Sequence, residues 1–259
     1  MTVDPWVAGE AYEPYIGRWS RLVAPQFVDW LGIPAGRRWV DVGCGTGALA
    51  AAVLSRAEPG SVLGVDPSPD FVAWAADHQP DGRASFAVGD AASLPPTCAD
   101  VVVSGLVVNF IPDPVPAVVA MAAAARVGTV AAYVWDYAGR MELLRHFWDA
   151  AAAVDPAAET LHEAARFPDC HPEALAALWA DAGLAEVATM ALEVTERFGS
   201  VDALWAPFLG GQGPAPGYVA TLAPERREAV RAVFQDRLPV APDGTVALTA
   251  RAFAVRGAA

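Results

Sequence analysis

The sequence predicts an α/β fold, built as one domain around a seven-stranded, mostly parallel sheet with helices on both faces. Strand-like and helix-like segments alternate over residues 38–137, a pattern typical of parallel strands joined by helical crossovers. The segment at 99–108 is apolar on both faces, as expected for a strand that helices cover on both sides. With 259 residues and 54% hydrophobic content, the chain can bury a core of the size this fold needs.

The first half of the chain supplies five strands and the helices that connect them. Ser68 precedes a helical pattern, and its hydroxyl is expected to cap that helix by accepting a hydrogen bond from a first-turn N–H. The strands are expected at 38–43, 61–66, 84–90, 99–108 and 129–137, and the helices at 48–57, 68–78 and 114–125.

The second half supplies three more helices and the last two strands. The segment 205–218 contains several Gly and Pro residues among bulky apolar ones, so it is expected to be a loop. The two final strands are expected to form an antiparallel pair at the end of the sheet. The helices are expected at 141–155, 171–184 and 224–238, and the strands at 186–198 and 245–255.

The net charge limits the kinds of partner that the protein is expected to bind. The net charge is -13, and all 17 basic residues are Arg, which argues against nucleic acid because phosphate contacts need a basic face. Cys44, Cys98 and Cys170 lie far apart, so neither a disulfide framework nor a metal site is expected. The sequence shows no signal peptide and no membrane-spanning segment. We therefore expect a cytoplasmic protein with no metal and no membrane partner.

A glycine-rich stretch, "VDVGCGTG" at 40–47, ends the first expected strand. Glycine tolerates positive φ and lacks a Cβ, so the backbone can turn tightly and approach a ligand. The free N–H groups of the next helix point towards the same place. A dinucleotide would need G-x-G-x-x-G, and Ala48 in the last position is a permitted variant. On these residues alone, both a dinucleotide and S-adenosylmethionine remain candidates.

The acidic residues that follow are spaced in a characteristic way. Asp66 ends the second strand in "GVDPS", Asp90 ends the third in "VGDAASLP", and Asp100 opens the fourth in "ADVVVSGLVVNF". With the glycine stretch, this order closely resembles class I S-adenosylmethionine-dependent methyltransferases over residues 38–135. The segment "WAPFLGGQGPAPGY" at 205–218 resembles one found in a group of bacterial small-molecule methyltransferases. The resemblance implies a Rossmann-like fold, S-adenosylmethionine as the cofactor and S-adenosylhomocysteine as the product.

The resemblance also implies a set of cofactor-binding residues at the carboxyl ends of the strands, where open α/β sheets bind ligands. It assigns the methionine part to the loop, the ribose to the second strand's end and the adenine to the third. The residues are Asp41, Gly43, Cys44, Gly45, Gly47, Asp66, Pro67, Asp90, Ala91, Ser104 and Gly105. One departure is Val108-Asn109, which stands where the family often has a His pair.

Three aromatic-rich stretches are candidates for the methyl acceptor's site, because methyl transfer needs alignment and exclusion of water. Each stretch has a structural alternative: an amphipathic surface helix at 11–32, a strand end packed in the core at 133–148, and an ordered surface loop at 205–218. The candidate substrate-binding residues are Tyr15, Arg18, Trp19, Asn109, Trp135, Tyr137, Trp205, Phe208, Gln212 and Tyr218. If a general base is needed, His146, Asp136 and Tyr12 are rival candidates.

The expected organisation is a single domain over 1–259, with an N-terminal helical cap at 1–34, a cofactor-binding core at 35–138 and a substrate lid at 199–244 between strands six and seven. The expected activity is methyl transfer to a small, aromatic or apolar metabolite, by a monomer or homodimer. Two alternatives stay open: an NAD(P)-dependent oxidoreductase, and a protein that binds S-adenosylmethionine without methylating. The absence of Lys excludes the Tyr-x-x-x-Lys pair of the commonest small oxidoreductases.

Overall fold

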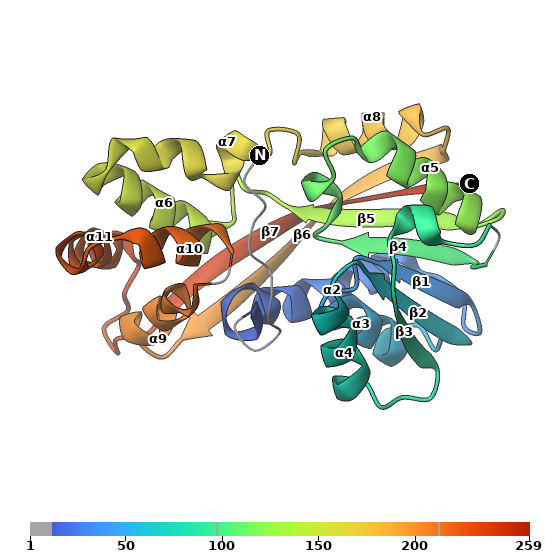
Figure 1. Ribbon diagram of the computed structural model, residues 1–259, viewed down its shortest axis with the longest axis horizontal. Helices are drawn as coiled ribbons and strands as arrows, with labels where there is room; N and C mark the ends of the chain where they lie inside the picture. The colour runs from blue at the N-terminus through green and yellow to red at the C-terminus, as the bar shows by residue number, and fades with distance from the viewer. Residues whose placement is uncertain (1–11, 97, 212) are drawn as a thin grey trace. The chain divides into compact units, whose positions relative to one another are not determined.

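A seven-stranded sheet organises the protein. The structure is a computed structural model that describes residues 12–96, 98–211 and 213–259 (Figure 1). The strand order is β3-β2-β1-β4-β5-β7-β6, which confirms the predicted fold class. The strands are β1 (Arg38–Val42), β2 (Ser61–Asp66), β3 (Ala84–Val88), β4 (Val101–Gly105), β5 (Thr129–Trp135), β6 (Ala185–Phe198) and β7 (Val246–Ala258).

Strands β1 to β5 pair in parallel, whereas β7 runs antiparallel to β5, with Thr129 opposite Ala258 and Trp135 opposite Ala252. The central strands are the apolar ones: β4 is buried from Val101 to Ser104. Burial on both faces is what a parallel sheet between two layers of helices requires. The parallel direction also brings the carboxyl ends of β1 to β4 to one edge.

The chain divides into two compact units. The first described here, the sheet unit, contains Ser20–Trp135, Asp169–Leu192 and Ala252–Ala259. Figure 1 shows α3 and α4 on one side of its strands and α5 and α8 on the other. Its helices are α2 (Arg18–Leu31, which begins two residues before the unit), α3 (Ala48–Arg56), α4 (Pro69–His78), η2 (Ala91–Ser93), η3 (Val108–Phe110), α5 (Pro114–Ala124) and α8 (Pro172–Asp181). As predicted, the Ser68 side chain caps α4 by accepting from Phe71 N at 3.4 Å.

The second unit, here called the aromatic unit, contains the described residues up to Trp19, together with Asp136–Pro168 and Glu193–Arg251. The boundary after Trp19 falls within the segment 1–34, to which the sequence assigned an N-terminal helical cap. Its helices are η1 (Glu13–Gly17), α6 (Glu142–Val154), η4 (Pro156–Leu161), α7 (Glu163–Arg166), α9 (Val201–Trp205), η5 (Ala206–Gly210), α10 (Pro214–Thr221) and α11 (Pro224–Arg237).

The prediction of a loop at 205–218 is wrong, because most of this segment is helical: α9 ends there, and η5 and α10 follow. Pro214 is the first residue of α10, where a missing N–H costs nothing. Gly211 and Gly213 both have positive φ, of 68° and 82°, and they form the break between the two helices. The glycines and prolines lie at helix ends, where they set boundaries instead of preventing helices.

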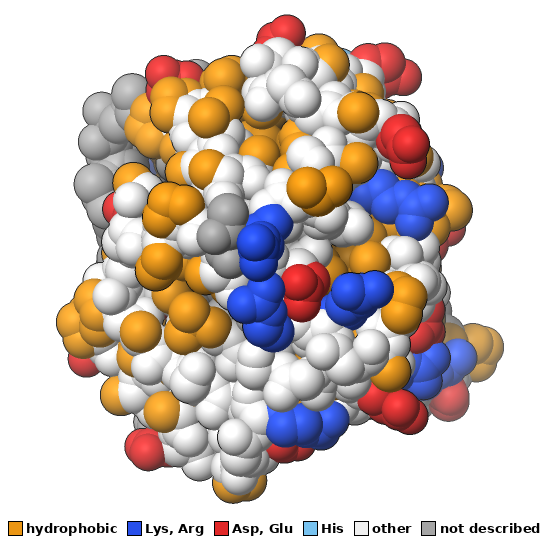
Figure 2. All heavy atoms as spheres, turned by 90° about the vertical axis from the view of Figure 1, so that its right-hand side faces the viewer, with side chains coloured by type: hydrophobic (Ala, Val, Ile, Leu, Met, Phe, Trp, Pro, Cys, Tyr) orange, Lys and Arg blue, Asp and Glu red, His pale blue; other side chains and the backbone are white. Residues whose placement is uncertain are grey.

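The surface carries arginines that are mostly paired with acidic residues. Figure 2 shows one face, on which Arg side chains lie among acidic and hydrophobic ones without forming a continuous basic area. Arg38 pairs with Asp100, at 3.2 Å, and Arg83 with Asp81, at 2.6 Å. In the described part of the chain, no helix is long and apolar enough to cross a membrane.

Candidate functional site

The glycine loop between β1 and α3 adopts the backbone that its sequence predicts. Gly43, Gly45 and Gly47 all have positive φ, of 73°, 52° and 83°, a region that other residues occupy at a cost. The loop is fastened to β2, because the N–H groups of Gly43 and Cys44 both donate to the Val65 carbonyl, at 2.8 and 3.0 Å. The glycines are therefore required by the loop's conformation.

Two of these glycines have different surroundings. A Cβ at Gly43 would lie 2.5 Å from a methyl carbon of Val107, whereas a Cβ at Gly45 would have no described atom within 4 Å. Gly43 thus allows the loop to pack against the chain that follows β4. At Gly45 the backbone faces open space, which is the kind of surface that a ligand can approach closely.

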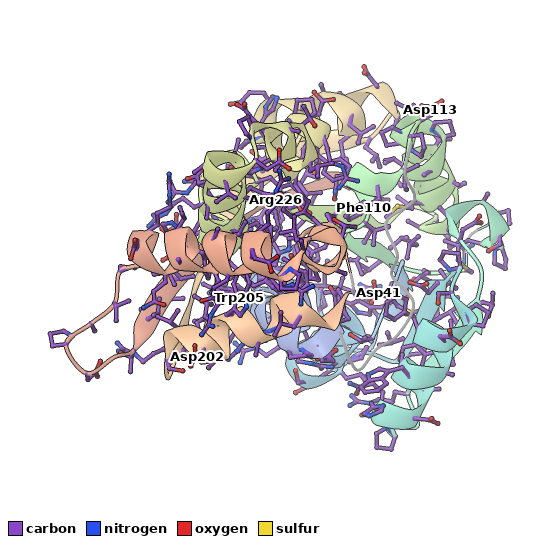
Figure 3. The ribbon with its side chains drawn as sticks, turned by 60° about the vertical axis from the view of Figure 1, so that its left-hand side comes forward. Asp41, Phe110, Asp113, Asp202, Trp205 and Arg226 are labelled. Atoms are coloured by element: carbon purple, nitrogen blue, oxygen red, sulfur yellow. The ribbon has the colours of Figure 1, made fainter. Side chains whose placement is uncertain are left out.

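Asp41, on β1 just before the loop, is a buried carboxylate (Figure 3). It is only 1% exposed, and neither carboxylate oxygen makes a hydrogen bond within the described residues. Burial raises the pKa of Asp41 to about 7, and the negative charge of Asp66 adds to the rise; the nearby N–H of Ala50, which lies outside hydrogen-bonding geometry, opposes it. A buried polar group without a partner is costly, so Asp41 favours a site that a cationic group completes.

Asp66, at the end of β2, holds the loop from the other side. Its two carboxylate oxygens accept hydrogen bonds from the N–H groups of Gly45 and Ser68, both at 2.9 Å. Burial raises the pKa of Asp66, while these two N–H groups lower it. Each oxygen keeps a second lone pair. Pro67, the next residue, is exposed.

Asp90 and Ala91 follow β3. The Asp90 carboxylate accepts from Ser93 N at 3.0 Å, and the Asp90 N–H donates to the Ser93 hydroxyl at 2.9 Å. This capping box orders η2, with Asp90 exposed and Ala91 buried. The N–H of Gly89 donates to the Asp66 carbonyl at 3.1 Å, so the ends of β2 and β3 are joined.

The end of β4 contains two unusual features that the sequence did not reveal. Leu106 has a φ of 64°, which is rare for a residue with a branched side chain. Asn109 has both atoms of its amide group buried without a partner among the described residues. Just before them, the Ser104 hydroxyl donates to the Val42 carbonyl at 2.9 Å, and a Cβ at Gly105 would lie 2.7 Å from the Tyr133 hydroxyl.

The groups at the strand ends of the sheet unit match the chemical groups of S-adenosylmethionine. The ligand has a positively charged methionine end, a ribose with two hydroxyls and an adenine. A buried, unpartnered carboxylate, an open glycine backbone and a second carboxylate with lone pairs to spare lie on the ends of neighbouring strands. The residues present therefore fit the cofactor. No single element of the sheet unit would provide these groups alone.

The aromatic unit collects rings from five of its described helices: η1, α6, α9, η5 and α11. Phe147 stacks on Phe208 with centroids 4.5 Å apart, and Phe208 lies edge-on to Tyr15 at 5.5 Å. Trp205 and Phe234 complete the group, 5.7 Å apart. Phe208 is fully buried and Trp205 is 5% exposed, so these rings form a core. Neither Phe147 nor Phe234 is among the candidate residues that the sequence suggested.

A buried carboxylate adjoins this cluster and was also missed. Glu163 is 3% exposed, and its Oε2 accepts from the Trp148 indole N–H at 2.5 Å. Trp148 also packs on Tyr218, with centroids 5.6 Å apart. Burial raises the pKa of Tyr218. The Trp148–Glu163 pair joins residues from different helices, and no local motif in the sequence predicts it.

Several candidate residues are engaged in structural contacts. Asp136 accepts from the N–H groups of Gly139 and Arg140 and from two nitrogens of Arg251, at 2.6 to 3.0 Å. Arg18 pairs with Glu196, and its guanidinium lies 4.4 Å from the ring centroid of Phe198. Through these contacts, Asp136 and Arg18 help to hold the aromatic unit together.

The remaining candidates differ in exposure. Burial, with a smaller effect of Arg145, lowers the pKa of the half-buried His146. Tyr12 is partly exposed. Trp19, Trp135 and Tyr137 are buried, at 0%, 2% and 5% exposure. Gln212 lies outside the described residues. In the described part of the chain, no group of three or more His, Cys, Asp or Glu side chains is arranged to hold a metal.

The chain is similar to known methyltransferases in sequence and in structure. A family model described as a methyltransferase domain matches residues 40–132, the stretch from β1 to β5. A putative methyltransferase from an antibiotic biosynthesis pathway of Anabaena variabilis is similar in structure, with a TM-score of 0.60 and 17% identity over 91% of this chain and 98% of that one.

Two further solved structures are similar. A putative methyltransferase of Bacillus halodurans has a TM-score of 0.56 and 12% identity, over 91% of this chain and 97% of that one. Phosphoethanolamine N-methyltransferase 2 of Haemonchus contortus, solved with phosphomonomethylethanolamine and S-adenosylhomocysteine, has a TM-score of 0.56 and 16% identity over 96% of this chain and 56% of that one. At these identities the likeness establishes the fold.

Proposed function

We propose that this chain is a class I S-adenosylmethionine-dependent methyltransferase, which the match of residues 40–132 to a methyltransferase domain supports, and that its methyl acceptor is a small aromatic or apolar metabolite. The observation that supports the proposal is the aromatic unit, whose core of buried rings from α6, η5 and α11 around Phe147 and Phe208 would give an acceptor site in this unit an apolar backing. The net charge of -13 and the pairing of surface arginines argue against a nucleic acid acceptor. The family match gives no support to an oxidoreductase.

The chain's own residues bind and orient the reactants. We assign Asp41 and the loop around Gly45 to the charged methionine end, Asp66 to the ribose, and Asp90 with Ala91 to the adenine. When bound, the cofactor supplies a sulfonium methyl carbon, which the acceptor's O, N or C attacks in line as the bond to sulfur breaks and S-adenosylhomocysteine leaves. The protein's part is alignment and exclusion of water.

The need for a base depends on the acceptor. Asp136 is surrounded by four N–H donors, an arrangement that suits a structural ion pair. His146, whose pKa is lowered mainly by burial, is neutral at physiological pH and keeps a nitrogen lone pair with which to accept a proton. Of the three candidates, we propose His146 over Asp136 and Tyr12.

Calorimetric titration followed by an acceptor screen tests the function. We expect S-adenosylmethionine and S-adenosylhomocysteine to bind in the micromolar range, with no binding of NADH. The screen would follow S-adenosylhomocysteine release with phenols, indoles, aromatic carboxylates, primary amines and tRNA. Turnover restricted to tRNA or to hydrophilic amines would overturn the proposed acceptor class. Tight cofactor binding without turnover of any acceptor would favour a protein that binds the cofactor without methylating.

Cofactor affinity should depend on pH through Asp41. Because burial raises the pKa of Asp41 to about 7, a proton occupies this carboxylate below that pH and competes with a cationic ligand. We expect the Kd for S-adenosylmethionine to rise about tenfold for each pH unit below 7 and to level off above it. Titrations in two buffers of different ionisation enthalpy should show one proton released per ligand at low pH.

Asp41→Asn is the matched control for this prediction. It should bind the cofactor more weakly, with a Kd that is flat over the same range of pH. The folded protein also binds the Asp41 proton more tightly than the unfolded chain, so wild-type stability without ligand should fall as pH rises from about 4 to 7. Asp41→Asn should lose this slope. A wild-type Kd independent of pH across this range would remove Asp41 from the methionine site.

A further inference from the structure

A cavity of about 390 Å³ lies in the aromatic unit between the α9–η5 segment and α11. Figure 3 shows these helices running alongside each other, with Asp202 and Trp205 labelled on α9. The volume falls within the range of small-molecule sites. One wall consists of Asp202, Trp205, Ala206 and Leu209, and the other of Pro224, Arg227, Glu228 and Arg231. None of these residues belongs to the proposed cofactor site.

Apart from Asp202, the first wall is apolar. The Trp205 ring is 5% exposed, and it is backed by Phe208 and Phe234, with centroids 5.6 and 5.7 Å away. Leu209 stands at the same wall with 56% of its surface exposed. A fixed indole edge beside an exposed aliphatic side chain suits a flat hydrocarbon group, which would cover both.

The opposite wall contains two arginines; within the described residues, one is paired with carboxylates and the other is not. Arg231 is neutralised by two carboxylates, Asp202 at 2.7 Å and Glu228 at 3.5 Å. Arg227 donates to the Leu222 carbonyl at 3.3 Å, and its Nε is buried without a partner. Within the described residues, Arg227 has no carboxylate partner. A guanidinium that is partly buried without a counter-ion favours an anion, and its planar fork fits a carboxylate.

We infer that this cavity binds a small aromatic carboxylate, with its ring against Trp205 and Leu209 and its carboxylate on Arg227. A cation would meet the unpaired charge of Arg227, because the two acidic side chains of the cavity are already paired with Arg231. A strongly hydrated anion such as phosphate would leave the apolar wall uncovered. The two walls together therefore specify both an apolar body and one negative charge.

The test compares indole-3-acetate with indole-3-acetamide, which has the same shape without the charge. Ligand-observed NMR and calorimetry would be run on the full chain with S-adenosylmethionine saturating, so that binding at the cofactor site does not contribute. We expect indole-3-acetate to bind wild type at least about tenfold more tightly than the amide. Arg227→Gln should remove this preference and bind the two ligands equally.

Two controls keep the result interpretable. Arg227→Gln should keep the wild-type affinity for S-adenosylmethionine, which shows that the variant is folded. Ala206→Trp, at an exposed position of the first wall, should fill the cavity and abolish binding of both indoles without changing a charge. Equal affinity of wild type for acid and amide, or unchanged acid binding in Arg227→Gln, would overturn the inference while leaving the proposed methyl transfer unaffected.

Discussion

Asp66→Ala is expected to weaken S-adenosylmethionine binding about a hundredfold or more. The Asp66 carboxylate accepts the N–H groups of Gly45 and Ser68, so its loss frees the glycine loop and also removes the proposed contact to the ribose. Hydrogen bonds to a charged group contribute about 1.5–3 kcal/mol each, and about 1.4 kcal/mol is a factor of ten in Kd. Calorimetric titration would measure the change.

Asp136→Ala is the control for this effect. Asp136 is also a buried aspartate with several N–H donors, but it belongs to the aromatic unit and holds Arg251 at 2.6 Å. This variant should lower thermal stability while its Kd for the cofactor stays near that of wild type. Similar Kd values for the two variants would contradict the assignment of Asp66.

Gly43→Ala is expected to destabilise the protein by about 2–5 kcal/mol. The backbone φ of 73° costs a residue with a Cβ about 1–2 kcal/mol, and overpacking adds about 1–3 kcal/mol, because the new methyl group would lie 2.5 Å from a methyl carbon of Val107. Denaturant unfolding of the protein without ligand would measure the loss. Adding Val107→Ala should relieve the contact and recover part of it.

Gly45→Ala should affect cofactor affinity more than stability. Its φ of 52° carries a similar conformational cost, but no described atom lies within 4 Å of the added methyl group. The loss of stability should therefore be smaller than for Gly43→Ala. The methyl group would instead stand where the cofactor is proposed to lie, and cofactor affinity should fall. A larger stability loss for Gly45→Ala than for Gly43→Ala would contradict this description of the loop.

The sheet and the glycine loop could be predicted because their signals are local. Positive φ at Gly43, Gly45 and Gly47 follows from residues that are adjacent in the chain. Strand and helix likewise differ in short-range periodicity, which a single sequence displays. Ser68 as a helix cap is a signal of the same kind. These features need no knowledge of what lies across the fold.

The contacts that fix the aromatic unit are long-range, and the sequence could not reveal them. Asp136 is one of three rival bases in the sequence, whereas the fold brings to it Arg251, 115 residues away. Glu163 reaches Trp148 from another helix. The helices at 205–221 were missed because Gly and Pro were counted by composition, and their position at helix ends depends on where each helix begins.

The buried carboxylate of Asp41 also has a consequence for how long the protein escapes proteolysis. Within the described residues, this buried carboxylate has no hydrogen-bond partner. On the proposed assignment it gains one when the cofactor binds, so the ligand-free chain is the less stable form. Ligand binding stabilises a folded chain by RT ln(1 + [L]/Kd). Because proteases act on opened chains, the amount of intact protein would follow the supply of S-adenosylmethionine. The residue that recognises the cofactor would then also tie the protein's abundance to it.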